Sequence, residues 1–288
     1  MADLFGTIDI GSTNCKIGIF DEEANFLYRD DSPISSQLLR RSGTIDPFEI
    51  WETVSGLLGR LPERIKRRLR ALCVIGQGPT VVPVDRSGQP LYRAITWLDG
   101  RGKERIPVLI DQGVDPQLAA GLSALEWLKE ELSEQAVLLQ PADYVAYRLT
   151  GRLANMSFPF VGYLPWSRQA LEERERSHAF LVPEIVEPGS LFSNLTQEAA
   201  DRFNLSPQTL LVAGAPDFVA ALVGTGTIED GSLCDRGGSS QGVTLCSKSE
   251  VFPPGLMTTP FFKPGLWKIS AIMNTTGIAL EWFCRKVT

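Results

Sequence analysis

The sequence has little cysteine and almost no histidine. Its 288 residues include five cysteines and one histidine, and no CxxC pair occurs. An odd number of scattered cysteines argues against a disulfide framework, and their spacing does not suggest a zinc site. Cys73 and Cys246 lie in apolar runs typical of strands, where a thiol packs as a small core residue. We therefore expect a reducing compartment, the cytoplasm.

Long apolar runs and an excess of positive charge are also lacking. No run approaches the roughly 18 apolar residues of a membrane-spanning helix, and the first residues lack the basic and apolar regions of a signal peptide. The formal net charge is −6, which argues against a general nucleic-acid binder. The one basic run, Lys66–Arg70, is interpreted as the solvated end of a helix. Neither a membrane nor a nucleic-acid partner is expected.

Common nucleotide and hydrolase motifs are missing or incomplete. Neither the P-loop pattern GxxxxGK[ST] nor the dinucleotide pattern GxGxxG occurs. Residues 238–242 fit the G-x-S-x-G pattern of serine hydrolases, but that pattern needs a histidine after the serine. His178 is the only histidine and precedes the pattern, so a hydrolase is disfavoured.

The order of expected elements predicts an α/β protein, because strand-like and helical patterns are interleaved throughout. Residues 4–29 read as an antiparallel meander with a glycine-rich first turn. Asp46 followed by Pro47 predicts the start of a helix. Further helices are expected at 116–132 and 142–149, whereas residues 152–195 are expected to be irregular, with surface loops and short elements.

The first chemical pattern joins a carboxylate, a glycine turn, hydroxyls and a lysine. Asp9 ends a strand-like run, and Gly11, Ser12, Thr13 and Lys16 follow it. Glycine lets backbone N–H groups approach phosphate oxygens, lysine adds a point charge, and aspartate can hold Mg²⁺ through water. The pattern therefore suits a nucleotide phosphate site, although an ordinary hairpin turn would use the same residue types.

Two later patterns are weaker when each is taken alone. In Gly214-Ala215-Pro216-Asp217, the proline favours a helix start and the aspartate suits a first helical turn. The same aspartate at a cleft could accept a proton as a general base. Residues 237–240, Gly-Gly-Ser-Ser, could cradle terminal phosphates or form only a flexible loop.

Together these patterns resemble the FGGY family of carbohydrate kinases, within the actin- and hexokinase-like ATPase superfamily. Further matches are a Gly-Gln pair at 76–77, a Trp-x-Asp-x-Arg segment at 97–101 and a D-Y-x-x-x-x-L-T-G-like helix at 143–151. The resemblance rests on the order and spacing of five motifs across nearly the whole chain. It implies a ribonuclease H-like, actin-like mixed sheet flanked by helices, with only the start of a second similar domain.

The resemblance also implies roles for individual residues. It makes Asp217 the catalytic base, Asp9 the Mg²⁺ residue, and Gln77, Trp97, Asp99 and Arg101 the sugar contacts. Phosphate binding is carried over to the two glycine–hydroxyl turns, that is, Gly11, Ser12, Thr13, Lys16, Gly238, Ser239 and Ser240. ATP and a sugar or polyol are the implied partners, and a homodimer is left open. An alternative places Trp97 in the core and makes Asp99 and Arg101 a structural ion pair.

Two departures from the family pattern limit what can be carried over. Gly78-Pro79-Thr80 stands where several members place polar side chains that grip the sugar, so the sugar cannot be named. Family chains also continue well beyond 288 residues. We expect residues 1–228 to form the sugar-binding domain and 229–288 part of the ATP-binding domain, with very low kinase activity. A non-catalytic sugar-binding or regulatory remnant is the alternative.

Overall fold

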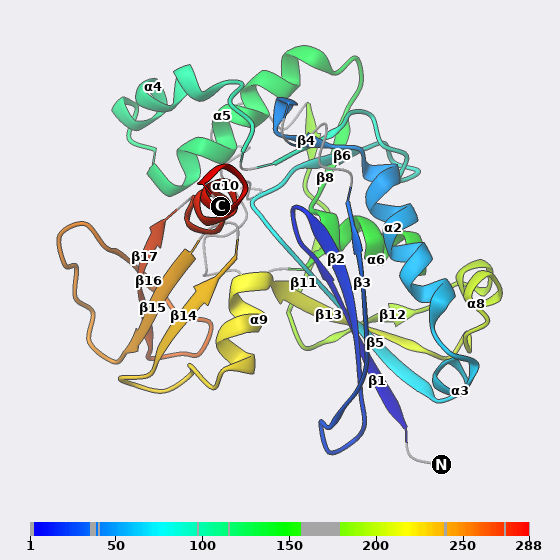
Figure 1. The fold of residues 1–288 in the computed structure, drawn as a ribbon. Coiled ribbons are helices and arrows are strands. Elements are labelled where there is room, and N and C mark those ends of the chain that lie inside the picture. The colour runs from blue at the N-terminus through cyan, green and yellow to red at the C-terminus, as the bar shows by residue number, and fades with distance from the viewer. Residues whose placement is uncertain are drawn as a thin grey trace. The chain divides into compact units, whose positions relative to one another are not determined.

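The computed structural model describes residues 3–34, 39, 41–96, 98–114, 116–156, 179–238, 241–273 and 275–287. Two compact units divide the chain between Asp217 and Phe218 (Figure 1). The domain boundary expected after residue 228 stays a prediction, since the compactness of a unit and the limits of an inherited domain are different properties. Each unit is taken by itself below.

A six-stranded mixed sheet forms the centre of the first unit. Its spatial order is β12-β13-β5-β1-β2-β3. The strands are β1 (Leu4–Ile10), β2 (Asn14–Phe20), β3 (Phe26–Pro33), β5 (Leu69–Gly76), β12 (Leu191–Asn194) and β13 (Leu210–Pro216). The meander β1-β2-β3 is antiparallel as predicted, whereas β1, β5 and β13 run parallel to one another.

Buried and more exposed side chains alternate along the strands, so one face of this sheet is apolar and is covered by helices. In β1, Leu4, Ile8 and Ile10 are buried, while Phe5 and Asp9 point to the opposite and more exposed face. Three helices pack against the buried face and against one another (Figure 1). They are α2 (Pro47–Arg60), α6 (Pro141–Thr150) and α8 (Gln197–Phe203).

The starts of two of these helices follow the sequence. The Asp46 side chain accepts a hydrogen bond from the Phe48 backbone N–H at 2.9 Å and caps α2, which begins at Pro47 as predicted. Thr196 caps α8 in the same way, through the Ala199 N–H at 3.1 Å. Such caps satisfy backbone donors that the helix itself leaves unpaired.

A smaller layer with its own apolar cluster completes the first unit. Its helices α4 and α5 pack around buried leucines such as Leu122 and Leu138. The remaining elements of the first unit, in either cluster, are α3 (Glu63–Lys66), β4 (Thr44–Ile45), β6 (Val82–Val84), β7 (Ala94–Ile95), a 3₁₀ turn (Lys103–Arg105), α4 (Ile106–Asp111), α5 (Pro116–Glu131), β8 (Ala136–Leu139), β9 (Ala154–Met156), β10 (Phe180–Leu181) and β11 (Glu184–Val186).

The described part of residues 152–195 consists of loops and short elements, as expected. It contains β9, β10, β11 and β12, and β12 joins the central sheet beside β13. These strands have only two to four residues, too short for a periodic pattern to stand out in the sequence.

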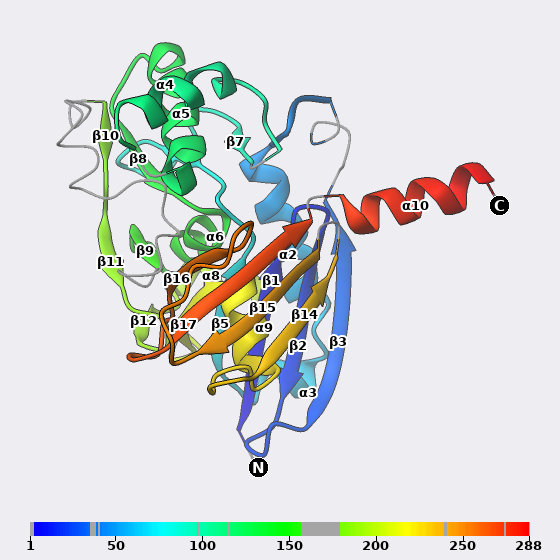
Figure 2. The same ribbon diagram turned by 90° about the vertical axis from the view of Figure 1, so that its left-hand side faces the viewer.

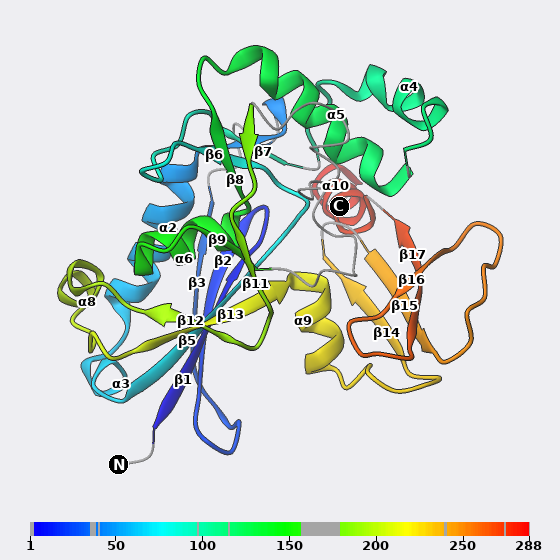
Figure 3. The same ribbon diagram turned by 180° about the vertical axis from the view of Figure 1, so that it is seen from behind.

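The second unit is an antiparallel sheet with a helix along one face. Its order is β14-β15-β17-β16, and the strands are β14 (Leu233–Gly237), β15 (Gln241–Ser247), β16 (Met257–Pro260) and β17 (Trp267–Met273). Helix α9 (Asp217–Gly224) lies along this sheet in all three views (Figures 1, 2 and 3). Helix α10 (Thr276–Val287) follows β17.

The described residues bear on two expectations, the burial of cysteines and the lack of a membrane-spanning helix. Cys246 is fully buried, as expected for a core cysteine, and Cys73 is partly buried, with burial raising the pKa of its thiol to about 11. Of the helices in the described ranges, none combines the length and the apolar character that crossing a membrane requires.

Candidate active site

Three candidate residues from distant parts of the chain meet at one edge of the central sheet. Ile10 is in register with Gly76, and Gly76 with Pro216, across the parallel strands β1, β5 and β13. The next residues along these strands are Gly11, Gln77 and Asp217. Because the carboxyl ends of parallel strands share an edge, the loops that follow them converge there, which is where open α/β sheets bind ligands.

A backbone hydrogen bond holds two of these strand ends together. The Gln77 N–H donates to the Ile10 carbonyl at 2.8 Å, so the chain after β5 is tied to the end of β1. The glycine turn after β1 is closed by a bond from the Gly11 N–H to the Asn14 carbonyl at 3.0 Å. A Cβ at Gly11 would lie 2.9 Å from the same carbonyl oxygen, so this tight turn requires glycine. Thr13 is exposed at its tip.

Asp9 and Lys16 face each other across the first hairpin. They are register partners in β1 and β2, and the Lys16 Nζ lies 3.4 Å from the Asp9 Oδ2. Both side chains remain partly exposed, at 31% for Asp9 and 45% for Lys16. A carboxylate beside an ammonium at a solvent-accessible edge can engage a metal–phosphate group, with the lysine on the phosphate.

The donor set suits Mg²⁺ in a nucleotide complex better than a metal held by protein alone. Among the described residues, no group of three or more histidine, cysteine, aspartate or glutamate side chains could enclose a cation. Mg²⁺ is usually bound through one or two carboxylates, water and substrate phosphates. Asp9, the carboxylate on the exposed face of β1, fits that pattern.

Asp217 begins α9 directly after the last residue of β13. Pro216 ends the strand in register with Gly76, so the backbone position of Asp217 is fixed by strand pairing on one side and by a helix on the other. A carboxylate in a first helical turn also interacts favourably with the helix dipole. The placement supports either function or simple helix stabilisation.

Close packing of two backbones positions this strand end. A Cβ at Gly214 would lie 1.8 Å from the Val74 carbonyl oxygen and 2.6 Å from its carbon. No side chain fits there, so β13 can approach β5 only with glycine at this position. The Gly214 N–H points to the Met156 sulfur at 3.3 Å, which links β13 to β9.

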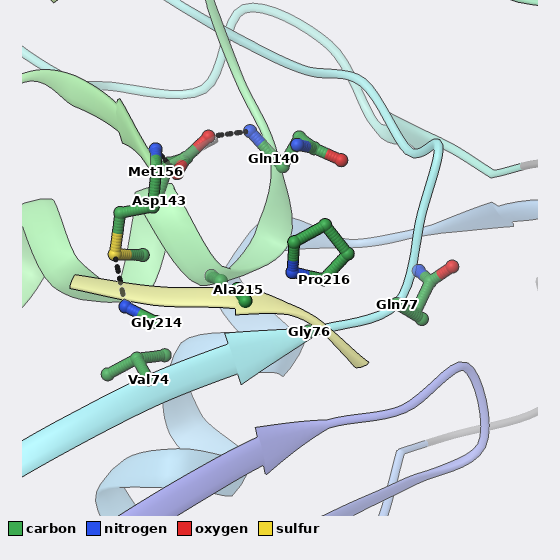
Figure 4. A pocket seen from close by; sticks show the side chains of 10 residues that line it. Val74, Gly76, Gln77, Gln140, Asp143, Met156, Gly214, Ala215 and Pro216 are labelled. Carbon is green, nitrogen blue, oxygen red and sulfur yellow. Dashed lines mark hydrogen bonds between the residues drawn. The ribbon is translucent and has the colours of Figure 1, made fainter. Parts of the chain in front are cut away.

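A cavity of about 10 Å³ lies behind the strand ends, between β5, β13 and the start of α6 (Figure 4). Gln77, one of its lining residues, is only 5% exposed. The Gln77 Oε1 accepts a hydrogen bond from the Thr80 hydroxyl at 2.9 Å, whereas its Nε2 is buried without a partner among the described residues. A buried donor without a partner is costly, and a ligand oxygen or a water would satisfy it.

Asp143, on the other wall of the cavity, is fully buried and accepts three hydrogen bonds of 2.8 Å, of which Figure 4 shows those from Gln140 and Met156. The donors are the backbone N–H groups of Gln140 and Met156 and the Asn155 amide. They join the start of α6 to β9. Burial, which disfavours the charged form, outweighs these bonds and raises the pKa of Asp143 to about 7.

This raised pKa makes stability depend on pH. Because the folded protein holds the Asp143 proton more tightly than the unfolded chain, the contribution of Asp143 is greatest below pH 4 and is lost as the pH rises through 7. Between pH 5 and 7 we expect a loss on the order of 2 kcal/mol in the free energy of unfolding. Denaturant titrations of the wild type and Asp143→Asn check this.

In Asp143→Asn this part of the pH dependence should disappear. If that variant is too unstable to measure, the carboxyl ¹³C shift of Asp143 in the wild type gives its pKa directly. A value near 4 would contradict the prediction.

Asp99 and Arg101 form an ion pair with each other. The Arg101 Nε lies 2.9 and 3.1 Å from the two Asp99 oxygens, and its Nη2 also donates to Asp99. The guanidinium stacks on the Trp127 ring, 4.0 Å from its centroid, and donates to the Tyr92 hydroxyl. These hydrogen bonds raise the pKa of Arg101 above its usual value.

The ion pair lies in the loop between β7 and α4, and whether Asp99 and Arg101 also contact the sugar stays a prediction. Asp99→Asn and Arg101→Gln should each lower the free energy of unfolding by about 2 kcal/mol, because each variant leaves the other residue of the ion pair charged and without its counter-ion. The double variant should lose less than the sum of the two. Chemical denaturation of all four proteins measures this coupling. Strict additivity, together with lost sugar binding, would instead favour direct sugar contacts.

Three of the expected site residues, Trp97, Ser239 and Ser240, lie outside the described residues. Gly238 follows β14 in the second unit, and its relation to Asp9 and Lys16 in the first unit is not described. The first phosphate turn, Gln77 and Asp217 are therefore the candidates that the structure brings together.

Residues 4–224 match the N-terminal domain of the FGGY family of carbohydrate kinases. The chain belongs to this family. A glycerol kinase of Thermococcus onnurineus is 27% identical and a xylulose kinase of Klebsiella pneumoniae 25% identical, each over 96% of this chain. The chain spans 61% of the length of each relative.

Solved structures of FGGY kinases share the fold. A ligand-bound xylulose kinase from Lactobacillus acidophilus superimposes with a TM-score of 0.83 at 18% identity, covering 99% of this chain and 63% of the other. A gluconate kinase from the same organism gives a TM-score of 0.81 at 17% identity, covering 98% and 62%. The expected actin-like α/β fold with a mixed central sheet is confirmed.

Two features of this site have little local signal in the sequence. Asp143 stands there only as part of a motif, although its carboxylate links α6 to β9. Gly214 was noted beside Pro216 and Asp217, but the closeness of the Val74 carbonyl depends on strand pairing between residues 140 positions apart. A charged residue in an otherwise apolar helix start was the available signal for Asp143.

Proposed function

We propose that this chain binds a sugar or polyol at the edge formed by β1, β5 and β13, and serves phosphoryl transfer from ATP to one of its hydroxyls. The observation that carries the proposal is the register of Ile10, Gly76 and Pro216, which brings Gly11, Gln77 and Asp217 together. Membership of the FGGY family supports it.

In the proposed reaction Asp217 orients the acceptor hydroxyl and takes its proton. The hydroxyl oxygen forms a bond to the γ-phosphorus of ATP, and the bond from that phosphorus to the β–γ bridging oxygen breaks, releasing ADP. Lys16 and the backbone of the Gly11–Thr13 turn hold phosphate oxygens. Mg²⁺, when bound beside Asp9, would neutralise charge on the phosphates.

Gln77 is proposed to hold the acceptor. Its buried Nε2 has no partner, and a sugar hydroxyl or ring oxygen would supply one. Gly78 and Pro79 follow it and offer no side-chain donor of their own. The recognition of the sugar in this loop is therefore assigned to Gln77 rather than to the residues after it.

A neutral polyol or ketose is favoured over an aldonate. Lys16 and Arg101, the two cations among the candidate site residues, are each paired with a carboxylate, Asp9 and Asp99. An aldonate carboxylate would compete with these pairs, whereas a neutral sugar needs only hydrogen bonds.

The test is a panel of acceptors incubated with γ-labelled ATP and Mg²⁺, with labelled product separated from ATP. Polyols, ketoses and aldonates form the panel, and binding of each is measured in parallel by calorimetry. Transfer to a neutral acceptor supports the proposal. Sugar binding with no transfer would instead show a non-catalytic sugar-binding protein, and the absence of both would reject the site.

A further inference from the structure

Two cations in the second unit share one aromatic ring. The Lys268 Nζ lies 4.3 Å from the centroid of the Phe218 ring, and the Arg236 guanidinium carbon lies 5.6 Å from it. Lys268 belongs to β17, Arg236 to β14, and Phe218 to α9, the helix that runs along this sheet (Figure 2). Two positive charges on a sheet face that a helix covers are unusual, because charged side chains are rarely buried unless they are paired.

The strand register shows how the two cations are arranged. Lys268 is paired with Thr259 across β16 and β17, so the two side chains lie on the same face. Arg236 is paired with Gly242, and a Cβ at Gly242 would lie 2.5 Å from the Arg236 Nη2. The Arg236 guanidinium thus lies directly over Gly242, where any larger residue would collide with it.

Hydroxyl groups share this face with the cations. Thr244 and Ser270, which are register partners on β15 and β17, lie 3.2 Å apart through their hydroxyl oxygens and are buried. The Thr259 hydroxyl is buried and unpartnered. The face therefore offers positive charge and O–H donors together.

Neither cation has a carboxylate partner within the described part of the chain. The Arg236 Nε is buried without an acceptor. Asp235, the adjacent carboxylate, accepts from the Gln241 amide at 2.8 and 2.9 Å. Burial and the charge of Arg236 lower the pKa of Lys268 to about 8. Charges held together and partly desolvated cost stability unless an anion joins them.

We propose that Arg236 and Lys268, with the hydroxyls of this face, form a binding site for a phosphate group. A guanidinium fork and an ammonium provide the directed donors and the double positive charge that a phosphate dianion requires. Arg236 directly precedes the Gly237-Gly238 turn, so a polyphosphate held at that turn could reach it. That the phosphate belongs to a nucleotide rests on the proposed kinase function. That the site binds a phosphate group does not depend on that function.

Calorimetry on the 288-residue chain tests the site with inorganic phosphate, pyrophosphate and ADP as probes, at constant ionic strength. Lys268→Met and Arg236→Met should each weaken binding by about tenfold or more, the loss typical of a charge-assisted contact. Lys248→Met is the matched control, since it makes the same change at an exposed position of the same unit. It should bind as the wild type does.

The three probes also distinguish free phosphate from a nucleotide as the source of the phosphate group. Binding of phosphate alone identifies free phosphate as the ligand. Tighter binding of ADP that pyrophosphate displaces identifies a nucleotide. Equal binding of every probe by all four proteins, or no binding of any probe, overturns the proposal. Neither cation makes a salt bridge to a described residue, so we expect both methionine variants to fold. A melting temperature of Lys268→Met above that of the wild type checks this.

A second measurement follows Lys268 itself. Its rate of acetylation by acetic anhydride at pH 8 is compared with that of Lys248 by mass spectrometry of peptides, with and without phosphate. Saturating phosphate should protect Lys268 and leave Lys248 unchanged; unchanged labelling of Lys268 would overturn the site. Neither result touches sugar binding in the first unit, so failure of this site and failure of the sugar site are distinguishable.

Discussion

Replacing Asp217 by asparagine should lower the rate of phosphoryl transfer by about 10³-fold, within the range that positioned general bases contribute. The amide has nearly the shape of the carboxylate but cannot take the acceptor proton. It has the same size in the first turn of α9, so the fold should be retained. Sugar affinity should change by less than about twofold, because the asparagine side chain can still form a hydrogen bond to the acceptor hydroxyl.

Single-turnover transfer from γ-labelled ATP, with the protein in excess, measures this effect even when turnover is slow. Asp201→Asn is the matched control, because Asp201 is an exposed aspartate on α8 of the same unit. It should transfer at the wild-type rate. Lost sugar binding in Asp217→Asn with transfer preserved would reject the assignment of Asp217 as the base.

Replacing Gly214 by alanine should lower the free energy of unfolding by about 3 kcal/mol or more, at the upper end of overpacking effects. The added Cβ would lie 1.8 Å from the Val74 carbonyl oxygen, and a backbone atom cannot move aside as a flexible side chain can. Strands β13 and β5 would have to separate where Asp217 is positioned. Phosphoryl transfer should therefore fall together with stability.

Gly59→Ala is the control for this substitution. Gly59 lies near the end of α2, is exposed, and has no atom within 4 Å of an added Cβ. Alanine there should raise the free energy of unfolding by about 0.5 kcal/mol or more, because glycine disfavours a helix. Urea titrations compare the two variants. A neutral effect at Gly214 would show that β5 and β13 are not packed this closely.

Local signals allowed much of the first unit to be predicted from its sequence. The meander β1-β2-β3 follows alternating runs around a glycine turn, and α2 starts at the Asp46-Pro47 pair that caps it. α6 ends at Gly151, which has a positive φ of 72°. Each of these depends on residues within a few positions of one another, so a pattern of neighbours suffices.

Features that depend on pairing between distant segments were not accessible in this way. The register that aligns Ile10, Gly76 and Pro216 joins strands separated by more than 60 and more than 130 residues, and no local pattern encodes it. The burial of Asp143 and the meeting of Arg236, Lys268 and Phe218 depend on the same kind of pairing. The order of the motifs gives the candidate residues, whereas the placement of these residues relative to one another requires the fold.

Sugar affinity of Gln77→Met against that of the wild type tests the central claim most directly. Calorimetry with a neutral acceptor should show at least about tenfold weaker binding in the variant, since a buried donor loses its ligand partner. Folding stability should fall by about 1 to 3 kcal/mol, because the buried Thr80 hydroxyl loses its acceptor, the Gln77 Oε1, whereas the Nε2 makes no bond to the described residues. Gln208→Met, at an exposed position, should bind as the wild type does. Undiminished affinity in Gln77→Met would place the sugar away from the ends of β1, β5 and β13 and contradict the account.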